Sequence, residues 1–248
     1  MKEDNDSDLD IDGDQGSKIK PTKPRKPLPL TPEEIENLVR RQRRNLRKAW
    51  AEGYLTAVAA MLKPGDLVLD CGANMGVVTA VLAATGADVI AYEPDPYAYK
   101  ILQDKFCLIR NVTLVNAAVG VGSGTVQLMR ADNFEANPDG ASVKSTILDG
   151  GRRIDGGNSI EVPLLDFPTL IRELVAARGE IVFVKMNIEG AELDILEELD
   201  RESLFTDIRC LVAETHERKF KGLRDRYKAL RMGIAERYPT GKVNLDWI

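Results

Sequence analysis

Five short apolar runs alternate along the chain with amphipathic segments of helix length, and this alternation constrains the fold more than any other feature. The runs are rich in Val, Ile and Leu and cover residues 67–70, 89–93, 112–116, 181–186 and 208–214. Strands that read as near-continuous apolar runs are typical of parallel sheets buried on both faces. The sequence therefore predicts an α/β fold, in which a doubly wound, mostly parallel sheet has helices on both faces.

The segments between the runs carry the apolar spacing of amphipathic helices. Helices are predicted at residues 76–84, 96–106, 167–177, 191–199 and 219–238.

A longer insertion separates the third and fourth strands. Residues 125–129 and 160–163 read as short β segments. The polar, glycine-rich stretch 130–159 between them is long enough for a mobile loop that shapes a substrate pocket. Residues 242–247 are predicted to add an edge strand.

The chain before the first strand divides into two parts. Residues 1–30 are acidic and then alternate Lys or Arg with Pro, and a segment so poor in apolar side chains is predicted to be disordered. At Thr31 a hydroxyl cap, a helix-starting proline and Glu34 have the spacing of a capping box. We expect a helix over residues 31–63, whose apolar second half packs on the core, and one main domain over residues 64–248.

The first half of this helix is strongly basic, with six Lys or Arg side chains between residues 40 and 48. Such a face could contact an anionic substrate or nucleic acid. It has no interleaved aromatic ladder, however, and a solvated face is the simpler interpretation. The formal net charge of -5 also provides no global field for nucleic acid, so no nucleic-acid partner is predicted.

Composition argues against several further classes of protein. No apolar run approaches the roughly 20 residues needed to cross a bilayer, and the acidic start differs from a secretory signal, so we expect a cytoplasmic protein. Cys71, Cys107 and Cys210 are widely spaced, which argues against a disulfide framework and a zinc site, and no metal ligands are predicted. No pattern in the sequence indicates an oligomeric state.

Residues 67–76 place two glycines where the first buried strand turns into a helix. Gly72 and Gly76 would let the backbone approach a ligand closely and let the helix pack against the strand. Dinucleotide-binding proteins use a related turn, so the loop alone does not identify the ligand. Asp70 distinguishes between the two kinds of cofactor. A carboxylate at the strand end would repel the pyrophosphate of a dinucleotide, and it would attract the ammonium of an amino-acid moiety such as that of S-adenosylmethionine.

The ends of the next two strands supply further candidate contacts at the same sheet edge. Glu93 can accept hydrogen bonds from both ribose hydroxyls of a nucleoside cofactor, which suits S-adenosylmethionine and NAD equally. Asn116, Ala117 and Ala118 end the third strand, where small side chains would leave room for an adenine ring. The alternatives are structural: a solvated carboxylate, and alanines that let a helix pack closely.

With these residues in place, the chain resembles the FkbM family of S-adenosylmethionine-dependent methyltransferases over about residues 68–216. In that family a motif near the fourth strand usually reads KIDVEGAE, so Asn187 stands where an aspartate is expected. The resemblance rests on residues 70–79 (DCGANMGVVT), 92–95 (YEPD), 116–120 (NAAVG) and 185–192 (KMNIEGAE).

The resemblance implies a class I, Rossmann-like methyltransferase fold. It also implies S-adenosylmethionine as cofactor and methyl transfer to the hydroxyl oxygen of a small molecule or glycan. If Asn187 replaces a residue that orders the substrate in relatives, the acceptor or the activity differs here. The expected cofactor contacts are then Ala73, Asn74 and Pro94 in addition to Asp70, Gly72, Gly76, Glu93, Asn116 and Ala117.

Ligands of open α/β sheets bind at the carboxyl ends of the strands, so residues after the fourth and fifth strands should face the transferred methyl group. Asn187, Glu189, Glu214 and His216 occupy these positions. His216, the only histidine, is the first candidate for a general base and Glu189 the second, while Lys185 is expected to pair with one of these acids. The alternatives are a histidine that orients a neighbour or faces solvent, and a carboxylate that interacts with the following helix dipole.

Two other functions are weighed against an O-methyltransferase. The first is a non-catalytic cofactor-binding or scaffold protein with the same fold, which the substitution at Asn187 would allow. A measurement of methyl transfer would distinguish such a protein from an enzyme. A nicotinamide-dependent oxidoreductase would use the same sheet. Its loop, however, should have a third glycine at the Rossmann spacing, and Asp70 is poorly placed for a pyrophosphate.

Overall fold

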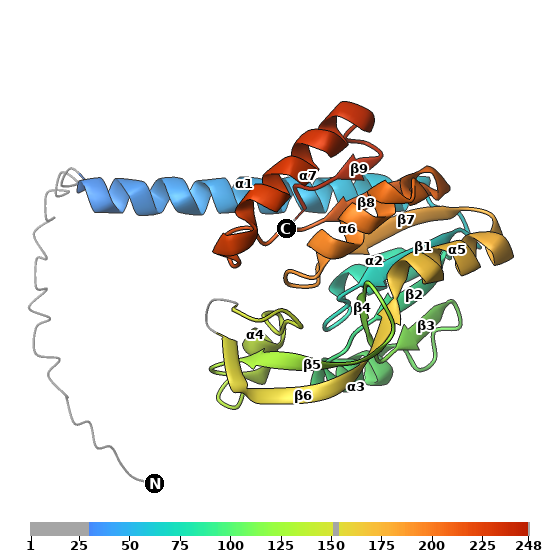
Figure 1. The fold of residues 1–248 in the computed structure, drawn as a ribbon, viewed down its shortest axis with the longest axis horizontal. Coiled ribbons are helices and arrows are strands. Elements are labelled where there is room, and N and C mark those ends of the chain that lie inside the picture. Colours follow the sequence, from blue (N-terminus) through green and yellow to red (C-terminus); the bar gives the residue numbers. More distant parts are fainter. Residues whose placement is uncertain (1–29, 151–153, 248) are drawn as a thin grey trace, which may run out of the picture. The chain divides into compact units, whose positions relative to one another are not determined.

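The computed structural model describes residues 30–150 and 154–247, and Figure 1 shows how the helices and strands follow one another. Two compact units divide the chain, residues 1–42 and residues 43–248. In the first unit the described part is the beginning of helix α1 (Pro32–Met61). Residues 1–29, most of the tail predicted to be disordered, lie outside the described residues.

A six-stranded parallel sheet forms the centre of the second unit (Figure 1). Every neighbouring pair is parallel, in the order β3-β2-β1-β7-β8-β9. The five predicted apolar strands are confirmed to within one residue at each end, and β9 is the predicted edge strand. The strands are β1 (Leu67–Cys71), β2 (Asp88–Tyr92), β3 (Val112–Val115), β7 (Ile181–Met186), β8 (Ile208–Ala213) and β9 (Val243–Asn244).

The strand order reverses between β1 and β7. From β1 the chain adds β2 and then β3 on one side, and it later returns to add β7, β8 and β9 on the other. The connections after β1 and β7 therefore lead to helices on opposite faces of the sheet, and such a reversal leaves a crevice for a ligand at the carboxyl edge.

The helices confirm the predicted positions and lie on both faces of the sheet. The predicted helix at 219–238 begins with a short 3-10 turn, η2 (Lys221–Leu223), before α7. No helix within the described ranges is long and apolar enough to cross a membrane. The α-helices that follow α1 around this sheet are α2 (Val77–Ala83), α3 (Pro96–Phe106), α5 (Phe167–Arg178), α6 (Glu192–Arg201) and α7 (Arg224–Arg237).

Successive residues of β1 show how the two faces are covered, because neighbouring side chains of a strand point to opposite faces. Leu69 belongs to a buried cluster with Ile171 of α5 and with side chains of α6 and α7. Its neighbour Val68 belongs to a second cluster with Val58 of α1 and Leu82 of α2. The doubly wound arrangement predicted from the apolar runs is confirmed.

Helix α1 begins with the predicted capping box. The amide of Glu34 donates to Thr31 Oγ1 at 3.2 Å, and the amide of Thr31 donates to Glu34 Oε2 at 2.7 Å. These two bonds satisfy backbone donors that would otherwise have no partner in the first turn. In the second unit, Ala51 and Val58 of the same helix are buried in the core, as the apolar second half predicted.

A second sheet is formed by the insertion that the sequence predicted to be largely a loop. Strand β6 (Ile154–Asp166) lies between β4 (Ala118–Gly120), which is parallel to it, and β5 (Gly124–Ala131), which is antiparallel. The predicted loop at 130–159 is therefore wrong at both ends, and helix α4 (Pro138–Ser142) lies within it. Pairing between distant segments decides these bounds, because the glycine-rich start of β6 has no apolar alternation of its own.

Candidate functional site

A cavity opens at the carboxyl ends of β1, β2 and β7, where the strand order reverses. It encloses about 640 Å³, a volume that includes its open mouth. Five of the predicted cofactor contacts and two of the predicted catalytic residues line it. These are Gly72, Asn74, Glu93, Pro94 and Ala117, with Asn187 and Glu189.

The remaining predicted residues lie behind this lining. Asp70 is fully buried below the glycine loop, and Ala73 is 5% exposed. Asn116 donates from Nδ2 to the carbonyl oxygens of Glu93 and Pro94, so it supports the loop after β2. Gly76 precedes α2, and His216 borders a neighbouring cavity. The binding and catalytic roles expected of these residues stay predictions.

Left-handed backbone at the glycine loop explains why two glycines occur in it. Gly72 has φ 77° and Gly76 has φ 76°, a region that side chains disfavour. A Cβ on Gly72 would overlap the carbonyl oxygen of Asn187, and one on Gly76 would press against the Phe106 ring. The absence of a side chain at Gly72 thus lets the loop after β1 pack against the backbone that follows β7.

Glu93 places a carboxylate at the cavity wall. Its Oε2 accepts a hydrogen bond from the amide of Asn74 at 2.8 Å, and its Oε1 accepts one from the amide of Asp95 at 2.9 Å. Burial raises the pKa of Glu93 to about 7, although these two hydrogen bonds act in the opposite direction. The carboxylate is oriented by backbone and keeps further lone pairs for a ligand.

Asp70 does not line the cavity. Its Oδ2 accepts a hydrogen bond from Thr79 Oγ1 at 2.7 Å, and its Oδ1 lies 3.0 Å from Lys185 Nζ. Lys185 also donates to the carbonyl oxygen of Gly72 at 2.8 Å. The expectation that Lys185 pairs with an acid after the fourth or fifth strand is wrong, because its side chain points across to β1.

Asn187 connects the cavity to the end of β8. Its Nδ2 donates to Glu214 Oε2 at 2.8 Å. Its buried Oδ1 has no hydrogen-bond partner among the described residues. An aspartate here would place a second carboxylate against Glu214, whose pKa burial already raises. The amide avoids that repulsion and leaves one acceptor for a ligand.

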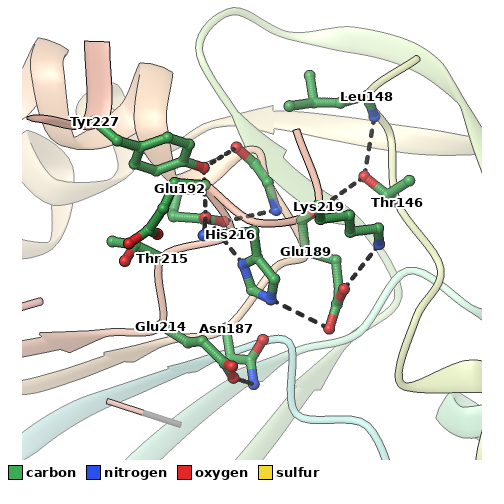
Figure 2. Close-up of polar contacts among 12 residues, drawn as sticks. Thr146, Leu148, Asn187, Glu189, Glu192, Glu214, Thr215, His216, Lys219 and Tyr227 are labelled. Carbon is green, nitrogen blue, oxygen red and sulfur yellow. Dashed lines mark hydrogen bonds and ion pairs between the residues drawn. The ribbon is translucent and has the colours of Figure 1, made fainter. Parts of the chain in front are cut away.

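His216 is held between two carboxylates (Figure 2). Its Nδ1 lies 3.0 Å from Glu192 Oε1 and its Nε2 lies 3.4 Å from Glu189 Oε1. Tyr227 also donates to Glu192 Oε1, at 2.8 Å, and so fixes the buried carboxylate. The histidine is thus clamped from both sides of its ring.

This clamp changes the charge of the histidine. Burial by itself would lower the pKa of His216, but the hydrogen bonds and charges of Glu189 and Glu192 outweigh it and raise the pKa to about 10. The ring is therefore protonated throughout the neutral range and has no lone pair for a substrate proton. This geometry does not fit the expectation of a base with a near-neutral pKa.

Glu189 is the carboxylate that both lines the cavity and contacts the histidine. Its Oε2 accepts a hydrogen bond from Lys219 Nζ at 2.8 Å. Burial tends to raise its pKa, but His216 and Lys219 outweigh that effect and lower the pKa. Glu189 has φ 58° and Asn74 has φ 47°. Left-handed backbone at two non-glycine residues of one cavity is the kind of strain that gathers at functional sites.

Residues from the end of α4 to Ile147 line part of the cavity. They lie within the stretch 130–159 that was expected to shape a substrate pocket, but no individual residue of it was predicted to do so. Thr146 Oγ1 donates to the carbonyl oxygen of Glu189 at 2.8 Å, as Figure 2 shows. Lys219 Nζ donates to the carbonyl oxygen of Lys144 at 2.8 Å, and Asn74 Nδ2 donates to Ser142 Oγ at 3.0 Å. No local sequence signal marks these contacts, because each joins residues far apart in the chain.

In the described part of the chain, no three or more His, Cys, Asp or Glu side chains are arranged so that they could hold a metal ion.

Residues 70–237 match the family model described as the methyltransferase FkbM domain. The match spans more than half of the chain, so the chain belongs to the FkbM methyltransferase family. This confirms the resemblance drawn from the four motifs and argues against the oxidoreductase alternative.

Similar proteins are methyltransferases of several kinds. The chain is 25% identical over 193 residues to methyltransferase sdnD of Sordaria araneosa, which covers 69% of this chain and 73% of that protein. A stretch of 55 residues is 49% identical to ribosomal RNA small subunit methyltransferase A of Thermotoga neapolitana, covering 22% of this chain and 21% of that protein.

Among solved structures, precorrin-6y C5,15-methyltransferase from Geobacter metallireducens is 12% identical, with a TM-score of 0.37, over 73% of this chain and 70% of that chain. Because the TM-score is low, the fold and the family are assigned here from the strand order and the family match alone.

The buried Asp70–Lys185 pair predicts a large loss of stability when one partner is removed. Lys185→Met should lower the free energy of unfolding by about 3–5 kcal/mol, because it leaves a buried carboxylate without its counter-ion. The exposed pair of Lys100 with Asp104 provides the control, and Lys100→Met should change the free energy by less than about 1 kcal/mol. Urea unfolding measures both, and equal effects would contradict this role for the pair.

Proposed function

We propose that this chain is an S-adenosylmethionine-dependent O-methyltransferase that acts on a hydroxyl group of a small molecule or glycan. Membership of the FkbM family supports methyl transfer. The observation that carries the proposal is Glu93, a carboxylate oriented by two backbone amides at the wall of the cavity beside the glycine loop.

The residues of the cavity fit the parts of this cofactor. Glu93 would accept hydrogen bonds from the ribose hydroxyls, and the small side chains of Ala117 and Ala118 would leave room for the adenine. The buried Ser145 Oγ lines the same cavity without a hydrogen-bond partner in the described residues. A polar group of a bound cofactor would provide that partner.

We assign Asp70 a role different from direct contact with the cofactor. Its carboxylate is fully buried, and Lys185 balances its charge. Lys185 in turn donates to the carbonyl oxygen of Gly72. The pair would therefore hold the shape of the glycine loop against which the cofactor binds.

Bound S-adenosylmethionine supplies a methyl group on a sulfonium whose leaving group needs no proton. The chain must orient the acceptor oxygen and take its proton. We propose that Glu189 accepts that proton, because it is the carboxylate of the β7 end that lines the cavity. Asn187 would position the acceptor through Oδ1, since Glu214 already orients its amide group.

His216 acts in this proposal as a positioning residue. Clamped between Glu189 and Glu192, it fixes the direction of the Glu189 carboxylate. Its positive charge, together with that of Lys219, also keeps Glu189 ionised and ready to accept a proton.

Binding of S-adenosylhomocysteine tests the cofactor site. Glu93→Gln should weaken binding about tenfold or more, because a charge-assisted hydrogen bond to the ribose is lost. Isothermal calorimetry measures the affinity, and Glu173→Gln, an exposed carboxylate of α5, is the matched control. If the unaltered protein does not bind S-adenosylhomocysteine, the proposed function is wrong.

The affinity for S-adenosylhomocysteine should also depend on pH. The pKa of Glu93 is raised to about 7, so the side chain is largely protonated below that pH and ionised above it. Because the ionised form accepts hydrogen bonds from the ribose, affinity should rise between about pH 6 and pH 8. Calorimetry across that range should show no such rise in Glu93→Gln, and the same rise in both proteins would exclude Glu93 as its cause.

Transfer of a labelled methyl group to a panel of hydroxylated small molecules and glycans tests the catalytic assignment. Glu189→Gln should lower the rate about 100-fold or more, with little change in S-adenosylhomocysteine affinity. His216→Gln should move the acid limb of the pH–rate profile upward, because Glu189 loses a cation that lowers its pKa. An unshifted profile would contradict the positioning role, and a fully active Glu189→Gln would exclude that residue as the base.

A further inference from the structure

A second cavity shares a wall with the proposed cofactor cavity. It is an open cleft of about 1,600 Å³ including its mouth. Glu214 lines it and accepts the hydrogen bond from Asn187, which lines the first cavity. His216 lines it too and contacts Glu189 on the other side. The residues proposed to carry out methyl transfer thus lie where the two cavities adjoin.

The cationic side chains of this cleft fall into two groups. Arg231 is paired with Asp246, and Lys219 is paired with Glu189. Arg47 and Arg218 also line the cleft and are exposed, and neither side chain has a hydrogen bond or ion pair within the described ranges. The charge of Arg47 acts to lower the pKa of Glu214 without a direct contact. Two guanidinium groups are therefore available to an anion from outside the chain.

An aromatic surface lies beside these guanidinium groups. Trp50 of α1 lines the cleft and is 43% exposed. It is supported by Tyr54, whose ring centroid lies 5.4 Å away and whose hydroxyl group contacts Cys210 Sγ at 3.0 Å. A large indole ring held in this way can contact a flat or apolar part of a ligand at little cost in side-chain entropy.

We propose that this cleft binds the methyl acceptor, and that the acceptor carries a phosphate or carboxylate group next to a flat or apolar part. Arg47 and Arg218 pair with the anionic group, and Trp50 contacts the apolar part. The acceptor hydroxyl then lies at Asn187 and Glu214, where the cleft adjoins the first cavity and Glu189. This rests on the proposed function and narrows its substrate class to anionic acceptors.

The two tryptophans of the chain, Trp50 and Trp247, both line the cleft, so intrinsic fluorescence reports its occupancy directly. The probes are phenyl phosphate and benzoate, with phenol as the neutral control, each titrated in the presence of S-adenosylhomocysteine. At least one anionic probe should change the fluorescence saturably, and phenol should bind at least about tenfold more weakly. A tighter response to phenyl phosphate indicates a phosphate acceptor, and a tighter response to benzoate indicates a carboxylate.

Substitutions in the cleft test whether the fluorescence change comes from binding of the probe to Arg47 and Arg218. Arg47→Gln and Arg218→Gln should each weaken binding of the anionic probe about tenfold. Arg110→Gln, at an exposed site that does not line the cleft, should leave it unchanged. Absence of saturable binding, equal binding of phenol, or unaltered affinity in both cleft variants would overturn the proposal.

Calorimetry with S-adenosylhomocysteine on the same samples separates the two hypotheses. If the cofactor product binds and the anionic probes do not, the acceptor proposal alone fails. If S-adenosylhomocysteine does not bind either, the proposed function fails with it. Both cleft variants should retain the affinity for S-adenosylhomocysteine, because neither residue lines the first cavity.

Discussion

The buried ion pair between Asp70 and Lys185 joins the two strands on which the site is built. The residues face one another across the β1–β7 pairing, and each has a second contact, with Thr79 and with the carbonyl oxygen of Gly72. Taking two charges out of water costs several kcal/mol per ion, so the pair persists only with close partners. Through Lys185 the pair contacts the glycine loop, which packs against the backbone of Asn187.

A second set of charges organises the other side of the crevice. Glu189 and Glu192 come from the β7–α6 segment, and His216 and Lys219 come from the segment after β8. Two carboxylates at one imidazole keep it protonated, and the cations in turn keep Glu189 ionised. The result is a carboxylate of fixed direction beside the cavity, bordered by a cleft in which the Arg47 side chain makes no hydrogen bond or ion pair with the described residues.

Local sequence patterns predicted the parts of this protein that local physics controls. Apolar runs located the five strands, and positions at strand ends placed Glu93, Asn187 and Glu189 at one cavity. The β segments predicted at 125–129 and 160–163 lie within β5 and β6, but the first half of β6 was missed, because it depends on pairing with β5 and not on its own alternation. The clamp on His216 was missed as well, because Glu192 is 24 positions away in the chain.

The sequence by itself determined the doubly wound sheet, the glycine turn after β1 and the membership of a methyltransferase family. Periodicity, glycine content and motif spacing are properties of neighbouring residues, so they can be read without coordinates. Only the tertiary structure decided that Asp70 is buried against Lys185 and that His216 is charged. Burial and charge pairing arise between segments distant in the chain, and the pKa of a side chain follows from them.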